Sequence, residues 1–565
     1  MTTTKLRRLL PYNKKECHNL SSLSLKSHTL LASSKNRIFI SMPFLILLII
    51  NCFLLTPVLS QSLANSFFTE PNTFAGFTTS VNEKGFELLS EYLRQRVTKF
   101  MQFGELYYNV TLPLTPSVNL MLIAQKVETF DSSNFRSQLK TFQGKELHWQ
   151  GSNLKSTVKT IYKIQSSGGE VTGQVPITFD NINVDMALQT LINTDGHLKT
   201  DMQICRIQLI ELSFGFSPND AEILRNYIPF IHRAVRDNID QILCPSFHAE
   251  LVPVISNRLL NTPMSSALFD HYFINYGLIG PVKYTQQNSI ELMHRGNVFG
   301  ILRQGRTRLN DFRLPFRSAP LTVIPDPKHM VTFQMSNYTI SSLLYWMDQY
   351  RKFDYEISKS SVNDSSIAGY LRTDCGKNDV CAGTLFPSLS KQFANGSVNI
   401  KTHTVSFPNV KLENGKIIVI VDSKIDAFVQ QTDKNPRFLS ANMLAEVSLQ
   451  SLAFKDYRLT GKLSIDSFKI TDVQSVVSGI DEGSLEFLIN ALNELLIAQD
   501  MAKKLKDGIK FPIVLDFEQS AANIKVEKDR LTIGVDFCFD ENCTKVEKSQ
   551  DANADYYDVV QGADG

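Results

Sequence analysis

The order of predicted elements occurs twice along this chain, and this duplication constrains the fold more than any other feature. A helix, a group of strands, a long helix and further strands occupy about residues 80–300, and the same order recurs over 331–537. A repeat of this length indicates two similar domains, because solenoid repeats span only about 20–50 residues. The 565 residues also exceed what one hydrophobic core usually supports. We therefore expect an α+β protein with two related domains.

The first predicted helix begins at a capping-box pair, Ser80 and Glu83. Apolar residues then recur at steps of three and four and form one stripe: Phe86, Leu89, Leu93, Val97 and Phe100. Strands are expected over residues 109–211, where apolar and polar residues alternate. An apolar stripe on a helix most often faces ordinary protein core, and it can also face a bound apolar ligand.

A second long helix is predicted over residues 219–244, and Pro229 inside it is expected to kink it. Its apolar stripe consists of Leu224, Ile228, Ile231, Val235 and Ile242. The stretch "FINYGLIG", Phe273–Gly280, then reads as a strand that is mostly apolar on both faces. Such a strand needs cover on both sides, from protein, a membrane or a bound apolar molecule.

The second half repeats this plan, with a helix over residues 339–353, strands, a long helix over Ser484–Lys506 and a last strand pair near Phe537. The predicted domains therefore span residues 61–300 and 331–548. Between them, residues 301–330 contain four prolines and five arginines without a core-forming period. This segment reads as a solvated linker, with an anionic-lipid site or a processing site as alternatives. The polar, acidic residues 549–565 are expected to be disordered.

The N-terminus has the parts of a secretory signal peptide over residues 1–60. Eight basic residues and one acidic residue precede an apolar run from Ile38 to Leu59, and small and polar residues follow it. Translation from Met42 instead of Met1 would leave a compact leader. An uncleaved signal anchor is the alternative, because the run is nearly long enough to span a bilayer. We expect cleavage near Ser60 and a secreted, extracellular protein.

Removal of this leader leaves six cysteines, which allow 15 pairings on paper. Spacing narrows the choice, since Cys375 with Cys381 and Cys538 with Cys543 can each close a short loop. Cys205 and Cys244 then remain for each other, and such bridges persist on a secretory route. Glycosylation sequons, which suit an extracellular chain, occur at Asn109, Asn337, Asn363, Asn395 and Asn542.

The sequence lacks the signals of several other function classes. The formal net charge of +2 gives no basic face for a nucleic acid. There is no G-x-S-x-G elbow, H-E-x-x-H or phosphate-binding loop, so an enzyme such as a lipid hydrolase is the least favoured reading. His148 and His248 each lie two residues from a glutamate, but no second histidine joins either one to form a metal site. We predict no cofactor and no metal.

Several ordered segments resemble the bactericidal/permeability-increasing protein and lipopolysaccharide-binding protein family. They are "FINYGLIGPVKYTQQNSIELMHRGNVF", "MVTFQMSNYTISSLLYW", "SVNIKTHTVSFPNVKLENGKIIVIVDSKIDAFV" and "KLKDGIKFPIVLDF". The similarity extends over about residues 75–538, and Cys205 and Cys244 lie where the family has its shared disulfide. The ordered set carries the resemblance, since no single motif is decisive.

The resemblance implies an elongated boomerang of two barrel-plus-long-helix domains joined by a central antiparallel sheet. It also implies two apolar pockets, one in each domain, that hold phospholipid acyl chains. Phe273–Gly280 would then be a strand that enters the central sheet and has one face toward the lipid. The candidate lipid-contacting residues are Phe86, Leu89, Leu93, Val97, Leu224, Ile228, Ile231, Val235, Tyr276 and Leu278.

One feature departs from the family's endotoxin-binding members, which carry a basic loop at the tip of the first domain. The matching turn here, "YKIQSSGGEV", holds a single base, Lys163, opposed by Glu170. Residues 61–300 contain 19 Lys and Arg against 21 Asp and Glu, a formal charge of −2. Recognition of anionic lipid A needs clustered positive charge. The sequence therefore favours a phospholipid carrier acting at membranes or lipid particles, with a defence protein that binds lipopolysaccharide as the alternative.

Overall fold

The computed structural model describes residues 74–103, 107–193, 196–260, 262, 264–269, 272–300, 314–360, 365–376, 379–487, 505–510 and 517–538. All of them belong to one compact unit. The predicted signal peptide, most of the predicted helix Ser484–Lys506 and the tail 549–565 lie outside the described residues. No described helix is long and apolar enough to cross a membrane.

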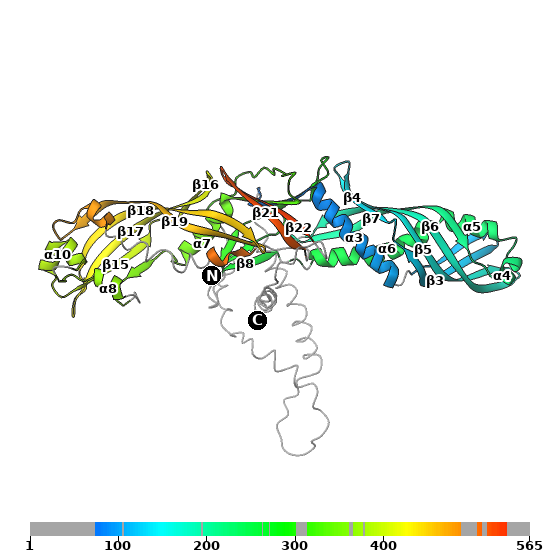
Figure 1. Ribbon diagram of the computed structural model, residues 1–565, viewed down its shortest axis with the longest axis horizontal. Coiled ribbons are helices and arrows are strands. Elements are labelled where there is room, and N and C mark those ends of the chain that lie inside the picture. The colour runs from blue at the N-terminus through cyan, green and yellow to red at the C-terminus, as the bar shows by residue number, and fades with distance from the viewer. Residues whose placement is uncertain are drawn as a thin grey trace, which may run out of the picture. The chain divides into compact units, whose positions relative to one another are not determined.

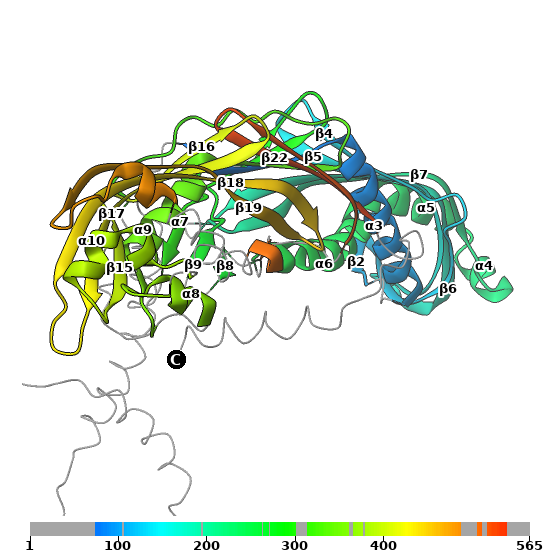
Figure 2. The same ribbon diagram turned by 60° about the vertical axis from the view of Figure 1, so that its left-hand side comes forward.

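The first half folds mainly into one curled antiparallel sheet with the strand order β2-β3-β5-β6-β7, and β4 pairs with β5. Helices α3 and α6 lie along this sheet (Figures 1 and 2). The elements of this half are β1 (Phe77–Val81), α3 (Glu83–Phe103), β2 (Asn109–Thr115), β3 (Val118–Asp131), β4 (Arg136–Phe142), β5 (Glu146–Ser166), β6 (Gly169–Ile192), β7 (Leu198–Phe214), α4 (Pro218–Ile223), α5 (Ile228–Asp237), α6 (Ile239–Leu260), β8 (Ser265–Phe269), β9 (Tyr272–Asn275), β10 (Lys283–Tyr284), β11 (Ile290–His294) and β12 (Val298–Gly300).

Alternation along the strands builds the core of this barrel. Residues such as Val158 on β5 and Ile177 on β6 are fully buried, while their sequence neighbours face outward. The buried stripes of α3 and α5–α6 pack on them, through Phe86 and Val97 on one side and Val235 on the other. The predicted amphipathic stripes therefore do form the inner faces of helices in an α+β fold.

The outer edge of this sheet, β7, is held by the helices beside it. The carboxylate of Asp240 accepts a hydrogen bond from the Ile207 backbone N–H at 2.6 Å, and the Arg236 guanidinium donates to the Ile210 carbonyl at 3.3 Å. The predicted Cys205–Cys244 disulfide is confirmed and joins β7 to α6, with its Cα atoms 6.0 Å apart. A helix thus covers an edge strand that would otherwise present unpaired backbone groups.

Two local predictions about the helices are wrong. Ser80 does not cap α3: it is buried in β1, and Asn82 accepts the capping hydrogen bond from the Gly85 N–H instead. The helix predicted over 219–244 is three helices, and α6 continues to Leu260. Pro229 does not kink a continuous helix, because it lies in the first turn of α5, where a residue without an N–H is tolerated.

The second half also forms a curled antiparallel sheet, with the order β14-β15-β17-β18-β19-β20 and β16 paired to β17. Short helices α9 and α10 pack on its inner face through Ala382 and Leu389 (Figure 2). The elements of this half are β13 (Val331–Ser336), α7 (Asn337–Gln349), β14 (Tyr355–Ile357), α8 (Ser365–Tyr370), α9 (Ala382–Leu385), α10 (Pro387–Gln392), β15 (Ser397–Thr404), β16 (Asn409–Glu413), β17 (Lys416–Gln430), β18 (Arg437–Lys455), β19 (Arg458–Ser475), β20 (Ile509–Lys510), β21 (Glu518–Glu527) and β22 (Arg530–Cys538).

The cysteines of this half bear out one further pairing. Cys375 and Cys381 form the predicted short-loop disulfide, with Cα atoms 6.5 Å apart. Cys538 is disulfide-bonded as well. Its predicted partner, Cys543, lies outside the described residues, so that pairing stays a prediction.

A six-stranded antiparallel sheet joins the two halves, in the order β10-β11-β1-β13-β22-β21. Strand β1 occupies its middle, between β11 of the first half and β13 of the second. Phe273–Gly280 does not enter this sheet as one strand, contrary to expectation. Strand β9 belongs to a separate sheet, β12-β9-β8, and ends at Asn275, whose side-chain oxygen accepts the Gly277 N–H at 2.8 Å and turns the backbone.

Candidate functional site

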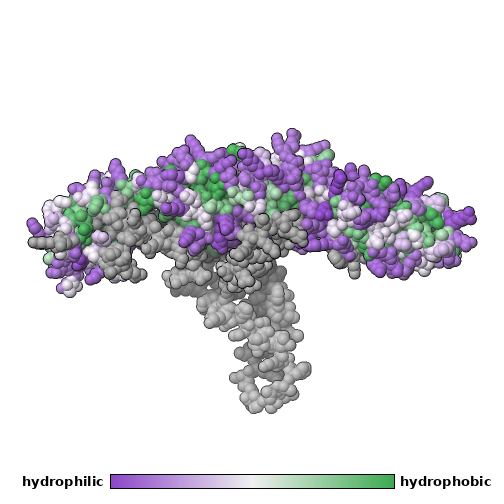
Figure 3. Space-filling view, in the orientation of Figure 1, coloured by the Kyte–Doolittle hydropathy of each residue, from purple (hydrophilic) through white to green (hydrophobic). Residues whose placement is uncertain are grey.

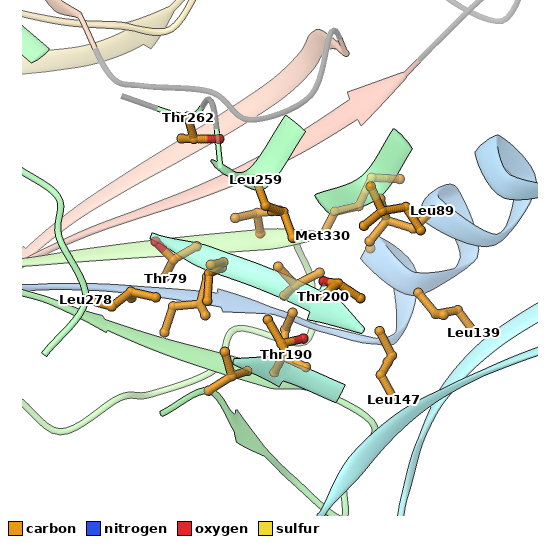
Figure 4. Close-up of a pocket in the computed structure, with 18 of the residues that line it drawn as sticks. Thr79, Leu89, Leu139, Leu147, Thr190, Thr200, Leu259, Thr262, Leu278 and Met330 are labelled. Carbon is orange, nitrogen blue, oxygen red and sulfur yellow. The ribbon is translucent and has the colours of Figure 1, made fainter. Parts of the chain in front are cut away.

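An apolar cavity of about 360 Å³ lies between the first barrel and the central sheet. Its size falls within the range of ligand pockets, about 300–1,000 Å³. Its walls come from α3, α6, the strands β4 to β7 and the central sheet (Figure 4). The outer face seen in Figure 3 is mainly hydrophilic, with separate apolar patches. The residues that line the cavity include Phe77, Val81, Leu88, Leu89, Tyr92, Leu93, Leu139, Leu147, Leu188, Leu198, Ile255, Leu259, Met264, Tyr276, Leu278, Ile290, Leu292, Met330, Phe333, Phe517 and Phe537.

The cavity wall carries no formal charge at neutral pH among the described residues. Its lining contains no Lys, Arg, Asp or Glu. The polar side chains are hydroxyls and one imidazole, from Thr79, Thr190, Thr200, Thr262, Tyr92, Tyr276, Tyr284 and His294. Burying an ion without a charged partner is very costly. This space can therefore accept apolar chains and neutral polar groups, and it excludes an ionised group.

His294 is held in the wall by hydrogen bonds on both ring nitrogens. Nδ1 lies 2.7 Å from the carbonyl oxygen of Tyr276 and Nε2 lies 3.0 Å from Oγ1 of Thr79. Since the carbonyl only accepts, Nδ1 carries the proton and Nε2 of the neutral ring accepts from the Thr79 hydroxyl. Burial lowers the pKa of His294 from its ordinary 6.5 to about 4, and the bond to Tyr276 opposes this shift. The imidazole is thus neutral at physiological pH.

The structure divides the ten candidate lipid-contacting residues into two sets. Four line the cavity: Leu89, Leu93, Tyr276 and Leu278. The other six lie in the core of the first barrel: Phe86, Val97, Leu224, Ile231 and Val235 are buried in it, and the partly buried Ile228 packs against it. Helix α3 contributes to both sets, because one part of its stripe packs on the barrel sheet and another part faces the cavity. Lipid contact by any of the ten stays a prediction.

Sequence reasoning missed the residues that the strands bring to the cavity. Leu139 on β4, Leu188 on β6 and Phe333 on β13 meet there although they are far apart in the sequence. Strand alternation marks each as inward-facing, but it does not indicate which inward position borders a cavity and which is packed. The pairing of β1 with β11 and β13 helps to bring these walls together.

A second apolar space lies inside the barrel of the second half and measures about 20 Å³. It is lined by twelve side chains, among them Phe386, Leu389 and Val398. Residues 488–504, predicted to form the long helix of this half, lie outside the described residues. A lipid pocket in the second half therefore stays a prediction.

The other sites suggested by the sequence are placed as follows. Asn109 and Asn395 are exposed, Asn337 is half-buried at the start of α7, and Asn363 lies outside the described residues. Among the described residues, no three His, Cys, Asp or Glu side chains are grouped so that they could hold a metal ion. His148 hydrogen-bonds Asp185 and Glu146, at 3.0 and 3.1 Å. Both of its ring nitrogens are thereby occupied.

The turn at the tip of the first barrel forms the β5–β6 hairpin, in which Ser166 pairs with Gly169. Lys163 and Glu170 approach to 4.0 Å across this hairpin. An exposed pair of this kind contributes little stability. It does place a negative charge beside the single base of the turn, so this tip presents no cluster of positive charge.

Comparison with known proteins supports one family. Residues 266–539 match the family model described as "LBP / BPI / CETP family, C-terminal domain". The "Crystal structure of lipopolysaccharide binding protein" is similar at 16% identity and a TM-score of 0.53, over 83% of this chain and 99% of that chain. The "Structure of P47 from Clostridium botulinum A2" aligns at 9% identity and a TM-score of 0.27, over 82% and 97%. A comparison with curated proteins finds no match.

At 16% identity and a TM-score of 0.53, the first of these structures shows a shared fold. The two curled α+β halves agree with that shared fold. The family model begins within β8 and extends through the second half. Residues 266–539 therefore match the C-terminal domain of the LBP / BPI / CETP family, and the chain shares its fold with lipopolysaccharide binding protein.

Proposed function

We propose that this protein is a secreted lipid carrier that holds acyl chains of a membrane lipid, such as a phospholipid, in the cavity beside the central sheet. The observation that carries the proposal is the apolar, charge-free lining of about 360 Å³ on a fold shared with a lipid-binding family. Each buried CH₂ group of an acyl chain contributes about 0.8 kcal/mol. Binding then needs no catalytic side chain, and an ionic head group remains outside the cavity.

Three features support an extracellular carrier. Two disulfides lie wholly within the described residues and Cys538 is disulfide-bonded as well, and such bonds persist in oxidising compartments. The apolar run after a basic N-terminus has the pattern of a signal peptide. A cavity that shields acyl chains from water also suits movement of lipid between membranes or particles.

The test is native mass spectrometry of the secreted protein, with extraction and identification of bound lipid. Leu93→Trp fills the cavity with a larger ring and should lower bound lipid at least fivefold. Phe230→Trp is the matched control, because Phe230 is 44% exposed on α5 and does not line the cavity. The Cys205–Cys244 bridge, read by peptide mapping, reports that the Leu93→Trp protein has folded. Secreted wild-type protein without any lipid would refute the proposal.

Binding of bacterial lipopolysaccharide is a separate outcome of the same work. Burial of acyl chains varies little with salt, whereas recognition by charge weakens as salt is added. The formal charge of −2 over residues 61–300 and the Lys163–Glu170 pair argue for the first behaviour. Nanomolar binding of lipopolysaccharide that collapses with added salt would favour a defence protein instead of a carrier.

A further inference from the structure

Three of the hydroxyl groups in the largely apolar wall of the cavity lie together. Thr190 on β6 and Thr200 on β7 are directly opposite in the strand register. Side chains at such positions have Cβ atoms about 4.5–5.5 Å apart. The Tyr284 hydroxyl donates to Oγ1 of Thr190 at 3.0 Å. Both threonines project from neighbouring strands into the cavity (Figure 4).

This hydroxyl cluster, Thr190, Thr200 and Tyr284, retains unused hydrogen-bonding capacity. Thr200 is only 5% exposed, and its hydroxyl forms no hydrogen bond within the part of the chain that the structure describes. Thr190 accepts from Tyr284, so its own proton is available to a further acceptor. Hydroxyls that face a cavity without a protein partner are available to a bound ligand. A ligand acceptor in the cavity would satisfy both threonines.

The chemistry of that acceptor follows from the surroundings. No lining residue offers a positive charge, so the cavity is unsuited to a phosphate or a carboxylate. An ester carbonyl is neutral, accepts hydrogen bonds and adjoins the acyl chains for which the rest of the wall is suited. We propose that the hydroxyl cluster binds the ester carbonyl of an acyl lipid, and that the cavity does not recognise head-group charge. This inference rests on the proposed function and identifies the group of the lipid that the protein recognises by hydrogen bonding.

The test compares lipids that differ only in this group. Delipidated full-length protein is titrated with vesicles that contain a diacylglycerol or the dialkyl ether with the same chains. The diester should bind about threefold to tenfold more tightly, as expected for one hydrogen bond. Phosphatidylcholine and phosphatidylglycerol with the same chains should bind within about threefold of the diacylglycerol. Equal binding of diester and diether by the wild-type protein would overturn the inference, and so would a tenfold dependence on head-group charge.

Variants connect the effect to these residues. In Thr190→Val/Thr200→Val, the preference for the diester should fall below about twofold, while the diether binds as before. Thr157→Val/Thr178→Val is the matched control, because these threonines form a cross-strand pair at 3.0 Å on β5 and β6 outside the cavity lining. Tyr284→Phe should reduce the preference for the diester in part. A full preference in the double variant would contradict the assignment, whereas loss of all lipid binding by the wild type would refute the proposed function itself.

Discussion

Acid should weaken this protein through His294. Its pKa is about 4 in the folded protein and ordinarily 6.5, so the unfolded chain takes up a proton that the folded chain resists. A depressed histidine pKa leaves stability intact above pH 6.5 and removes it as the pH falls toward 4. The shift corresponds to at most about 3 kcal/mol, of which about 2 kcal/mol is lost between pH 7 and pH 5. Protonation also makes Nε2 a donor, so the Thr79 hydroxyl must reorient.

The assay is urea unfolding of delipidated protein at several pH values, for the wild type and for His294→Gln. Glu291, on the same strand, has its pKa raised by burial, an effect that Lys283 opposes. That carboxyl contributes in the opposite direction, since its stabilisation is lost as the pH rises. The difference between the two proteins isolates His294, because both retain Glu291. Equal losses between pH 7 and pH 5 in both proteins would refute this reasoning.

The remaining predictions concern the bridge, the sheet edge and processing. Cys244→Ser removes a bridge that closes a loop of 39 residues, which contributes about 4 kcal/mol of stability in the chain-entropy model. It should lower secretion far more than Cys375→Ser, whose bridge spans 6 residues. Comparable secretion of the two variants would contradict this. Asp240→Ala leaves the backbone N–H of Ile207 unpaired and should cost about 1–3 kcal/mol in thermal unfolding, whereas an unchanged midpoint would count against the edge contact. Terminal sequencing and glycopeptide mapping should find a start near Gln61 and a glycan on the exposed Asn395; secreted material that retains the Met1 region would disprove cleavage.

The duplicated order of elements and the two apolar stripes predicted the fold, because periodicity reports which face of a helix or strand is buried. It does not report what lies against that face. Leu93 and Val97 share one stripe on α3, yet Leu93 borders the cavity and Val97 is packed in the core. Side-chain hydrogen bonds to nearby backbone N–H groups set two element boundaries that periodicity does not predict. Asn82 caps α3 in place of Ser80, and the Asn275 side chain ends β9.

The central sheet joins strands from both ends of the described chain, and this bears on the order in which the elements of the protein can pair. Val81 on β1 pairs with Val331 on β13, and Val331 pairs with Val535 on β22. The central sheet therefore cannot form completely until these later strands have been synthesised. Pairings across such sequence distances form slowly, whereas the first barrel sheet is complete at residue 214. The cavity therefore lacks the walls that Phe333 and Phe537 provide until β13 and β22 have been synthesised. Under the proposed function, a lipid bound before these walls close would stabilise the chain by mass action.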